Sequence, residues 1–226
     1  MISDDGGIGL MQITNTAGYD VDKLKYDLPY NIKAGIEFLV NNFKRGDLPK
    51  INDHDPANLE SWYFAIMAYN GTVPANSPFY QETGEINYNA YQEKVYKKLS
   101  EFGAVNAHIR SIPMKSTDFE YDRESSDPIE FLKNSYVMDE ALLTPTKQLF
   151  EVGETVTYEG SGIRSIPSTQ GTLIPVASSD SMEIISAPVY DVNEDSRNQF
   201  VWYPVEMSKN GKVVKGYIAS QYAVKK

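Results

Sequence analysis

Residues 6–14 read GGIGLMQIT, and this stretch is the first indication of how the chain folds. Glycines surround a short apolar segment, and glycine allows a backbone to turn sharply and to approach a ligand closely. Met11 offers a soft apolar contact, and the amide of Gln12 can both donate and accept hydrogen bonds. The Gly-Lys-Ser/Thr ending of a phosphate-binding loop is absent. Taken alone, the stretch fits a ligand-binding loop and a turn before a core helix equally well.

Three segments in the first 103 residues have the apolar periodicity of helices. They span 29–43, 55–71 and 88–103. In the second of these helices, Asp55 is expected as the N-cap and Pro56 as the first helical residue. Apolar side chains are expected to form one face of each helix: Ile32, Ile36, Leu39, Val40 and Phe43 in the first, Leu59, Trp62, Tyr63, Ile66 and Met67 in the second, and Tyr88, Tyr91, Val95, Leu99 and Phe102 in the third.

The rest of the chain changes character twice. Residues 104–148 are polar and acidic, which predicts a connecting segment, with a short helix near 128–134. Residues 149–226 contain five short β-rich runs, and Asn210-Gly211 between two of them is a strong hairpin signal. We therefore predict an α+β protein of two domains: a helical domain over 1–103, and a small β-barrel over 149–226.

Composition excludes several classes of function. The 226 residues carry a formal net charge of −10, which argues against binding nucleic acid through a general positive field. No apolar run is long enough to be a transmembrane segment, and no signal peptide opens the chain. There is no cysteine, and two histidines, His54 and His108, stand in unrelated contexts and are expected at the surface. We therefore expect no metal site and no cofactor.

A second motif indicates how the stretch at residues 6–14 can be interpreted. Residues 68–71 read AYNG at the end of the second predicted helix, and residues 31–39 read NIKAGIEFL. Gly-Leu-Met-Gln, this helix and Ala-Tyr-Asn, in this order, resemble the soluble lytic transglycosylase and goose-type lysozyme family over about residues 6–102. The resemblance implies a lysozyme-like helical domain whose groove binds the glycan strands of peptidoglycan.

The resemblance also implies roles for individual residues. Gly9, Leu10, Met11 and Gln12 would line the groove near the reacting sugar. Tyr69 would lie near the catalytic carboxyl group, and Asn70 would bond a sugar substituent. In the family, one glutamate protonates the glycosidic oxygen between N-acetylmuramic acid and N-acetylglucosamine.

This chain departs from the family at that glutamate. The family places it in a Glu-Ser motif upstream of Gly-Leu-Met-Gln, whereas none of the eight residues before Gly9 is a glutamate. We therefore expect an inactive chain, either a piece of a longer protein or a natural remnant. Asp4 and Asp5 are weak catalytic candidates. Glu60-Ser61 matches the letters of the motif but lies inside the second predicted helix, where Glu60 is expected to be solvated.

The β-rich half resembles bacterial SH3-like domains. Residues 162–174 read GIRSIPSTQGTLI, and residues 200–222 follow the closing pattern of such domains, with Tyr217 where tryptophan is usual. The resemblance implies binding to the peptide bridges of the cell wall. Five residues are candidates for the wall-facing surface, although Trp202 also suits a core position: Tyr158, Arg164, Trp202, Tyr203 and Tyr217.

The sequence thus predicts a cell-wall protein of the lytic transglycosylase type. Its expected partners are peptidoglycan glycan strands and peptide bridges, and its full-length form is expected outside the cell or in the wall of a Gram-positive bacterium. A wall-binding module that never cleaves is the first alternative. An intracellular interaction protein with a coincidental set of motifs is the second, because short motifs match by chance.

Overall fold

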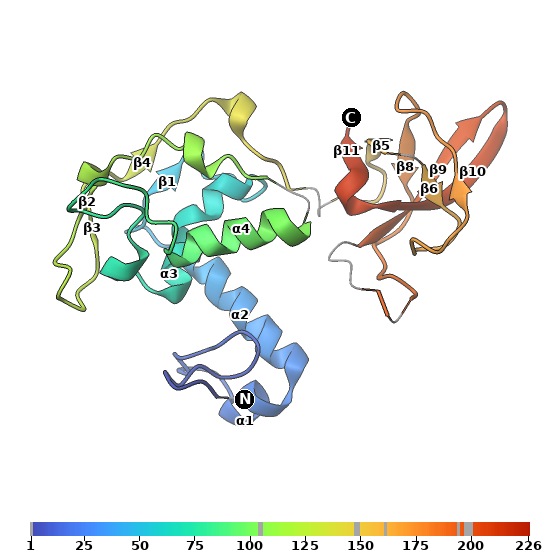
Figure 1. Ribbon diagram of the computed structural model, residues 1–226. Helices are drawn as coiled ribbons and strands as arrows, with labels where there is room; N and C mark the ends of the chain where they lie inside the picture. Colours follow the sequence, from blue (N-terminus) through green and yellow to red (C-terminus); the bar gives the residue numbers. More distant parts are fainter. Residues whose placement is uncertain (1, 104–105, 147–149, 161, 194, 197–200) are drawn as a thin grey trace. The chain divides into compact units, whose positions relative to one another are not determined.

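The computed structural model describes residues 2–103, 106–146, 150–160, 162–193, 195–196 and 201–226. It is a mixed α and β structure with few helices and one large antiparallel sheet (Figure 1). The chain divides into two compact units. Unit 1 comprises Met1–Val95 and His108–Leu143, and unit 2 comprises Tyr96–Ala107 and Thr144–Lys226. No helix in the described ranges is long and apolar enough to cross a membrane.

Unit 1 contains the predicted helices and one that the sequence did not reveal. The elements are α1 (Val21–Tyr26), α2 (Leu28–Phe43), α3 (Tyr63–Asn70) and the start of α4 (Tyr91–Gly103). Asp20 caps α1, because its side chain accepts hydrogen bonds from the amides of Asp22 and Lys23. Six residues are too few to show a helical period, so the cap was the only available signal.

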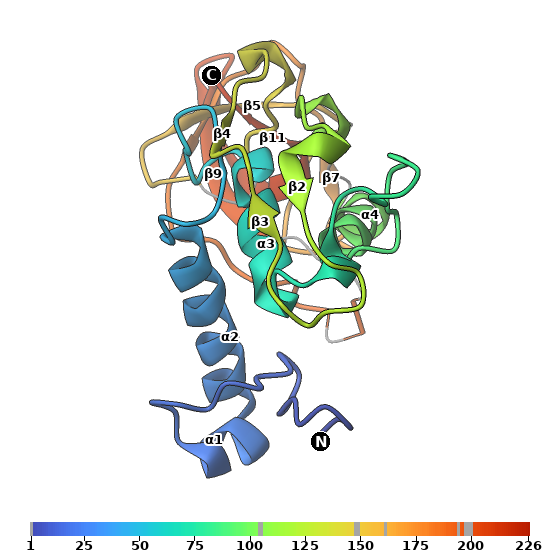
Figure 2. The ribbon, with the colours of Figure 1, turned by 90° about the vertical axis from the view of Figure 1, so that its left-hand side faces the viewer.

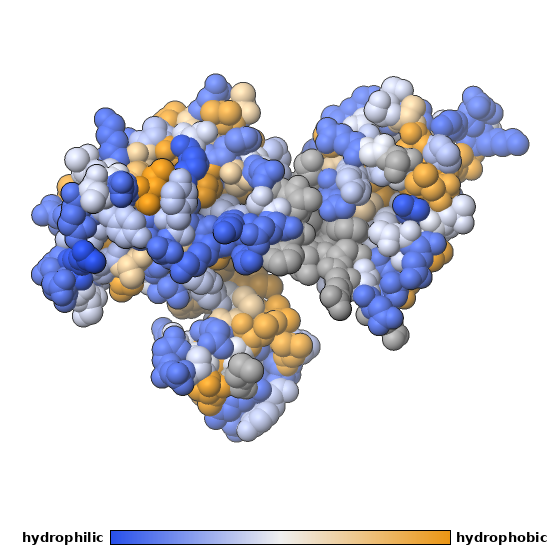
Figure 3. Space-filling model, viewed as in Figure 1, coloured by the Kyte–Doolittle hydropathy of each residue, from blue (hydrophilic) through white to orange (hydrophobic). Residues whose placement is uncertain are grey.

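Helix α2 confirms the first predicted helix but buries a different face. Asp27 caps it by accepting a bond from the amide of Tyr30 at 3.0 Å. Asn31 and Gly35 are buried, whereas Ile36, expected in the core, is 53% exposed. Small and polar residues are buried here because the N-terminal loop packs along this part of α2 (Figure 2). Figure 3 shows hydrophobic residues gathered on the visible side of α2.

Helix α3 begins later than predicted. Leu59–Trp62 form a 3₁₀ turn, and Asp55 accepts a hydrogen bond from the amide of Ala57 instead of capping the helix. The expectation that Glu60 is solvated was wrong. Its side chain is fully buried, and its Oε1 accepts a hydrogen bond of 2.7 Å from the amide of His108. The sequence could not show that a distant segment supplies this donor.

The predicted connecting segment belongs largely to unit 1. Residues 108–143 supply β2 (Phe119–Glu120), β3 (Glu130–Phe131) and β4 (Ser135–Tyr136), which pairs in parallel with β1 (Lys50–Ile51). A strand, β3, therefore replaces the helix expected near 128–134. The sparse aromatic residues of this polar segment pack on Phe64, with Tyr136 stacked at 5.8 Å and Phe131 edge-on at 5.7 Å between ring centroids.

Unit 2 is built on a seven-stranded antiparallel sheet in the order β11-β5-β8-β9-β10-β6-β7. In the described part of the chain, the outer strands β11 and β7 do not pair with each other, so the sheet is open and the closed barrel is not confirmed. The strands are β5 (Thr155–Tyr158), β6 (Ile163–Arg164), β7 (Leu173–Ile174), β8 (Met182–Ile184), β9 (Trp202–Lys209), β10 (Lys212–Ala219) and β11 (Ala223–Lys225).

The predicted hairpin at Asn210-Gly211 is confirmed. It joins β9 to β10, with Lys209 opposite Lys212. Asn210 has φ of 53° and Gly211 has φ of 74°, and two consecutive positive φ values are what a tight two-residue hairpin turn requires.

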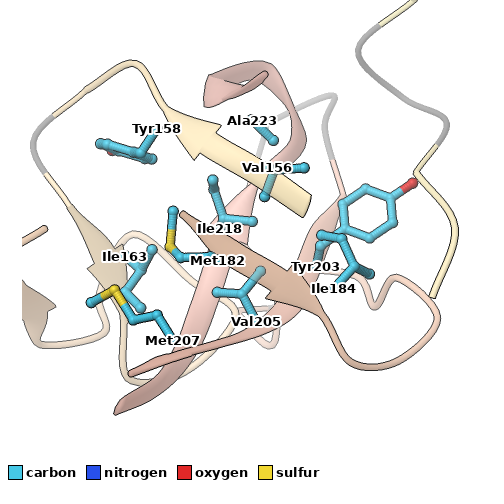
Figure 4. Packing of buried hydrophobic residues seen from close by; sticks show 10 residues of the cluster. All are labelled: Val156, Tyr158, Ile163, Met182, Ile184, Tyr203, Val205, Met207, Ile218 and Ala223. Carbon is cyan, nitrogen blue, oxygen red and sulfur yellow. The ribbon is translucent and has the colours of Figure 1, made fainter. Parts of the chain in front are cut away.

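The core of unit 2 lies on one side of this sheet (Figure 4). Ile184, Val205 and Ile218 come from three different strands and are fully buried. The cluster as a whole consists of Val156, Tyr158, Ile163, Met182, Ile184, Tyr203, Val205, Met207, Ile218 and Ala223.

Candidate functional site

A cleft of about 470 Å³ lies in unit 1, where the N-terminal loop meets three helices. Its floor is apolar, and amide, hydroxyl and carboxylate groups lie among the aliphatic side chains. This composition is typical of small-molecule sites, in which a few polar groups orient a ligand over apolar walls. The lining residues are Asp5, Leu10, Met11, Gln12, Thr14, Leu39, Ile66, Tyr69, Asn70, Tyr91 and Val95.

The N-terminal loop forms one wall of the cleft through a tight turn. The backbones of Ile8 and Ile13 exchange two hydrogen bonds, of 3.0 and 3.1 Å. Within the turn, Gly9 has φ of 71° and Gln12 has φ of 52°. A Cβ on Gly9 would lie 2.3 Å from the side-chain nitrogen of Asn31, so only glycine fits there. Gln12 is held in its left-handed conformation by its own side chain, whose Nε2 donates to the carbonyl of Gly9 at 2.7 Å.

Asn31 of α2 holds this loop in place through its side-chain amide. Its Oδ1 accepts from the amide of Met11 at 2.9 Å, and its Nδ2 donates to the carbonyls of Ile8 and Leu24 at 2.9 and 3.1 Å. Asn31 is 1% exposed, so these backbone groups would have no water to replace it. One turn further along α2, Gly35 leaves room for the side chain of Met11. The predicted helix motif around Asn31 therefore has a physical role as the support of the loop.

Tyr69 of α3 holds the same loop from the other side. Its hydroxyl donates a hydrogen bond of 2.7 Å to the carbonyl of Met11. Its ring packs edge-on to Phe38 at 5.3 Å and stacks with Tyr91 at 6.4 Å between centroids. Burial, with smaller contributions from Tyr91 and Tyr19, raises the pKa of Tyr69 to about 12. The phenol therefore stays protonated at physiological pH and remains a donor.

Asn70 follows Tyr69 at the end of α3 and is exposed to the cleft. Its Oδ1 accepts a hydrogen bond of 3.1 Å from Nδ2 of Asn76. Gly71, with φ of 104°, ends the helix directly behind it. The helix terminus therefore places the amide of Asn70 at the edge of the cleft instead of in the core.

Asp5 is the only carboxylate among the described lining residues. It accepts hydrogen bonds from the hydroxyl of Ser3 and, at 3.3 Å, from the amide of Gly7, and these bonds lower the pKa of Asp5. A lowered pKa keeps the group ionised at neutral pH, whereas a general acid must hold its proton there. Asp4 is exposed and does not line the cleft. Neither aspartate has the environment of a catalytic acid.

Sequence reasoning missed part of the lining. The helical spacing of Leu39, Tyr91 and Val95 predicts only that each lies on the apolar face of its helix, but all three line the cleft. Periodicity identifies the face of a helix that is covered by the rest of the protein, yet a cleft floor and a core give the same pattern. Only the nearby Gly-Leu-Met-Gln and Tyr-Asn motifs could have indicated the difference.

The aromatic candidates of unit 2 lie elsewhere than expected. Tyr158, Trp202 and Tyr203 are 5%, 3% and 2% exposed, so the expectation that Tyr158 and Tyr203 face the wall polymer was wrong, and Trp202 has the buried position that was its alternative. Tyr158 and Tyr203 belong to the core, and the indole N–H of Trp202 donates to Asp191 at 3.3 Å. A small unit uses its largest side chains to build its core.

Arg164 and Tyr217 remain accessible. They face each other as partners on β6 and β10, and both are partly exposed. Arg164 also donates to the carbonyl of Gly171 at 3.0 Å. These two residues are the part of the predicted wall-facing surface that the structure leaves open to solvent.

Potential metal ligands are scattered. Within the described ranges, no group of three or more histidine, aspartate or glutamate side chains is placed to hold a metal ion. His54, expected at the surface, is partly buried: its ring stacks on Phe43 at 3.8 Å, and its Nε2 lies 2.8 Å from the carbonyl of Phe43. His108, as expected, is exposed.

Comparison of the chain with models of protein families, with curated proteins and with solved structures gave no match.

Proposed function

We propose that unit 1 binds the glycan strands of peptidoglycan in this cleft, as a protein of the lytic transglycosylase type. One observation carries the proposal. Gln12, Tyr69 and Asn70 come from motifs almost 60 residues apart, and they line the same cleft. Asn31, from the third motif, supports the N-terminal loop that carries Gln12. Random motif matches have no reason to converge in this way.

The chemistry of the cleft suits a sugar. Tyr69 and Tyr91 offer aromatic surface on which the C–H face of a sugar ring can pack. The amides of Gln12 and Asn70 can bond hydroxyl or acetamido groups. The aliphatic side chains of the lining offer apolar surface that a bound sugar ring can cover. A lysozyme-like helical fold for unit 1 and an SH3-like fold for unit 2 are part of the same proposal.

We further propose that this chain binds glycan without cleaving it. No glutamate is among the described residues that line the cleft, and the bonds from Ser3 and Gly7 favour the ionised form of Asp5. A positioned general acid typically contributes about 10²–10⁴-fold to the rate of a reaction. Mass spectrometry of purified peptidoglycan incubated with the chain should therefore detect no anhydromuropeptides. Release of such products that disappears with Asp5→Asn would contradict this expectation and identify Asp5 as a substitute acid.

Sedimentation with insoluble peptidoglycan tests the binding. The wild-type chain should sediment with the polymer, and Asn70→Ala should weaken binding about fivefold or more, because one bond to the ligand is lost. Asn41→Ala is the matched control, since Asn41 is an exposed asparagine of unit 1 outside the cleft. If both variants sediment like the wild type, the cleft is not where the polymer binds.

The second candidate is wall binding by unit 2 alone. It is favoured by the partly exposed pair of Arg164 and Tyr217 on neighbouring strands. Loss of sedimentation in Arg164→Ala, with Asn70→Ala unaffected, would favour this second candidate over the first.

A further inference from the structure

A buried asparagine outside the cleft controls one of the polar groups inside it. Asn76 ends the 3₁₀ turn Pro74–Asn76 that follows α3, and it is 4% exposed. Its Nδ2 lies 2.8 Å from the carbonyl of Gly71, and its Oδ1 lies 3.2 Å from the amide nitrogen of Tyr91. A carbonyl can only accept and a backbone amide can only donate, so these two partners determine which end of the Asn76 amide is nitrogen and which is oxygen.

The orientation of Asn76 determines that of Asn70. The second hydrogen of the Asn76 Nδ2 is donated to Oδ1 of Asn70 at 3.1 Å. If the Asn70 amide were rotated by half a turn, two NH₂ groups would face each other and the Nδ2 of the buried Asn76 would lose this acceptor. Asn70 therefore keeps its oxygen toward Asn76. In the described structure, its Nδ2 has no hydrogen-bond partner, and the residue lines the cleft.

The support of Asn76 is itself fixed. Gln92 of α4 is fully buried, and its Nε2 donates to the backbone carbonyl of Asn76 at 2.9 Å. The same Nε2 lies 3.4 Å from the hydroxyl of Tyr63. The turn that carries Asn76 is thus held by Gln92 of α4, which in turn contacts Tyr63 of α3, and the orientation of Asn70 is set before any ligand binds.

We infer that Asn76 is a positioning residue that fixes the polarity of Asn70, so that the cleft offers a hydrogen-bond donor at this point and selects ligands that carry an acceptor. This inference rests on the proposed function for its choice of ligand. On an N-acetylated hexosamine, the acceptor is the acetamido carbonyl. A de-N-acetylated hexosamine has an ammonium group instead, which only donates and cannot pair with the Asn70 NH₂ group. The cleft should therefore discriminate against de-N-acetylated glycan.

The decisive variant is Asn70→Asp, which keeps the shape of the side chain. The carboxylate can still accept the bond from Asn76, but its second oxygen presents an acceptor and a negative charge to the cleft. Calorimetric titration of the full chain with tetra-N-acetylchitotetraose and with the glucosamine tetramer measures the result. We expect affinity for the acetylated tetramer to fall about tenfold and affinity for the glucosamine tetramer to rise. Asn41→Asp, which adds the same charge outside the cleft, should change neither affinity.

A second variant tests Asn76 itself. Asn76→Ser replaces an amide of fixed polarity by a shorter side chain whose hydroxyl can either donate or accept, so the Asn70 amide can rotate and discrimination between the two tetramers should shrink. Equal discrimination in the wild type, Asn70→Asp and Asn76→Ser would overturn the inference while leaving glycan binding intact.

Hydrogen exchange provides a readout that needs no ligand. In the wild-type chain, the side-chain NH₂ protons of Asn76 should exchange slowly, and those of Asn70 should exchange at the rate of an exposed amide. If neither tetramer binds, the proposed function fails, and this exchange experiment alone decides the orientation. Fast exchange at Asn76 would show that it does not hold Asn70, and would overturn the inference.

Discussion

Tyrosine residues occupy different environments in the two units. In unit 1, Tyr69 and Asn70 lie at the end of a helix and face a cleft. In unit 2, Tyr158 and Tyr203 lie within strands and form the core. A helix terminus leaves its last side chains open, whereas the face of a sheet that packs on the core is filled with large residues. The same tyrosine therefore indicates a binding site in one context and a packing residue in the other.

The cleft loop of unit 1 and the sheet of unit 2 also differ in what stabilises them. The loop at the cleft is held by directional hydrogen bonds from Asn31 and Tyr69 to backbone groups. The sheet of unit 2 is held by apolar packing on one side. Loss of a hydrogen-bonding side chain should therefore destabilise the cleft loop, and a cavity in the core should destabilise the sheet. Each unit has one tryptophan, Trp62 or Trp202, so the two indole N–H signals in an NMR spectrum report the unfolding of each unit separately.

The largest effect is expected in the core of unit 2. Tyr203→Ala should destabilise this unit by about 3–5 kcal/mol, because it removes a buried ring that packs on Phe150. Urea titration followed through the Trp202 signal measures the loss. Tyr217→Ala is the control and should cost about 1 kcal/mol or less, since Tyr217 is partly exposed. Equal losses at both positions would mean that the contrast between core and surface tyrosines does not hold.

A smaller effect is expected at the support of the cleft loop. Asn31→Ala leaves the Met11 amide and the Ile8 and Leu24 carbonyls without their partner, which should destabilise unit 1 by about 2–4 kcal/mol. Asn41→Ala makes the same change on the exposed side of the same helix and should cost about 0.5 kcal/mol or less. The Trp62 signal should report the loss of stability in Asn31→Ala. The Trp202 signal should report no loss in either variant. A loss of similar size in both variants would show that the hydrogen bonds of Asn31 are not what holds the loop.

Local signals predicted much of the fold. The periodicity of residues 29–43 and the Asn210-Gly211 pair led directly to α2 and to the β9–β10 hairpin, because each depends on a few neighbouring residues. Long-range partners could not be predicted. Glu60 is buried because the amide of His108, 48 residues away, meets it, and no local pattern records that pairing.

The candidate site could be predicted only in part, because it too depends on residues that are distant in the sequence. Gln12, Tyr69 and Asn70 could be named from their motifs, but the spacing of Tyr91 and Val95 predicts only an apolar helix face, which a cleft floor and a core share. Asn76 had no motif at all. Its role follows from two backbone partners that only the folded chain brings together.

The smallest expected effect concerns the pH dependence of unit 1. Glu93 is buried, its Oε1 accepts from the hydroxyl of Tyr63 at 2.6 Å, and its Oε2 contacts Arg110. Burial raises the pKa of Glu93 despite both partners. A raised pKa means that the folded state favours the protonated form. This contribution to stability is complete below the pKa of the unfolded chain, about 4.3, and is lost as the pH rises through the folded pKa.

Urea titrations of Glu93→Gln at pH 4 and pH 7 measure this contribution. The free energy of unfolding of the wild type minus that of Glu93→Gln should be smaller at pH 7 than at pH 4. Glu82→Gln provides a contrast, because the Glu82 backbone amide and Arg123 lower the pKa of Glu82, so the difference should have the opposite sign. The same sign in both variants would show that burial does not dominate at Glu93.

The most direct test of glycan binding in unit 1 is an NMR titration of the full, isotope-labelled chain with tetra-N-acetylchitotetraose. Binding in the cleft predicts saturable shifts that cluster at Gln12, Tyr69 and Asn70 and leave the signals of Arg164 and Tyr217 unchanged. Shifts that cluster at Arg164 and Tyr217, or no saturable shift at all, would contradict the proposal that the cleft of unit 1 binds glycan.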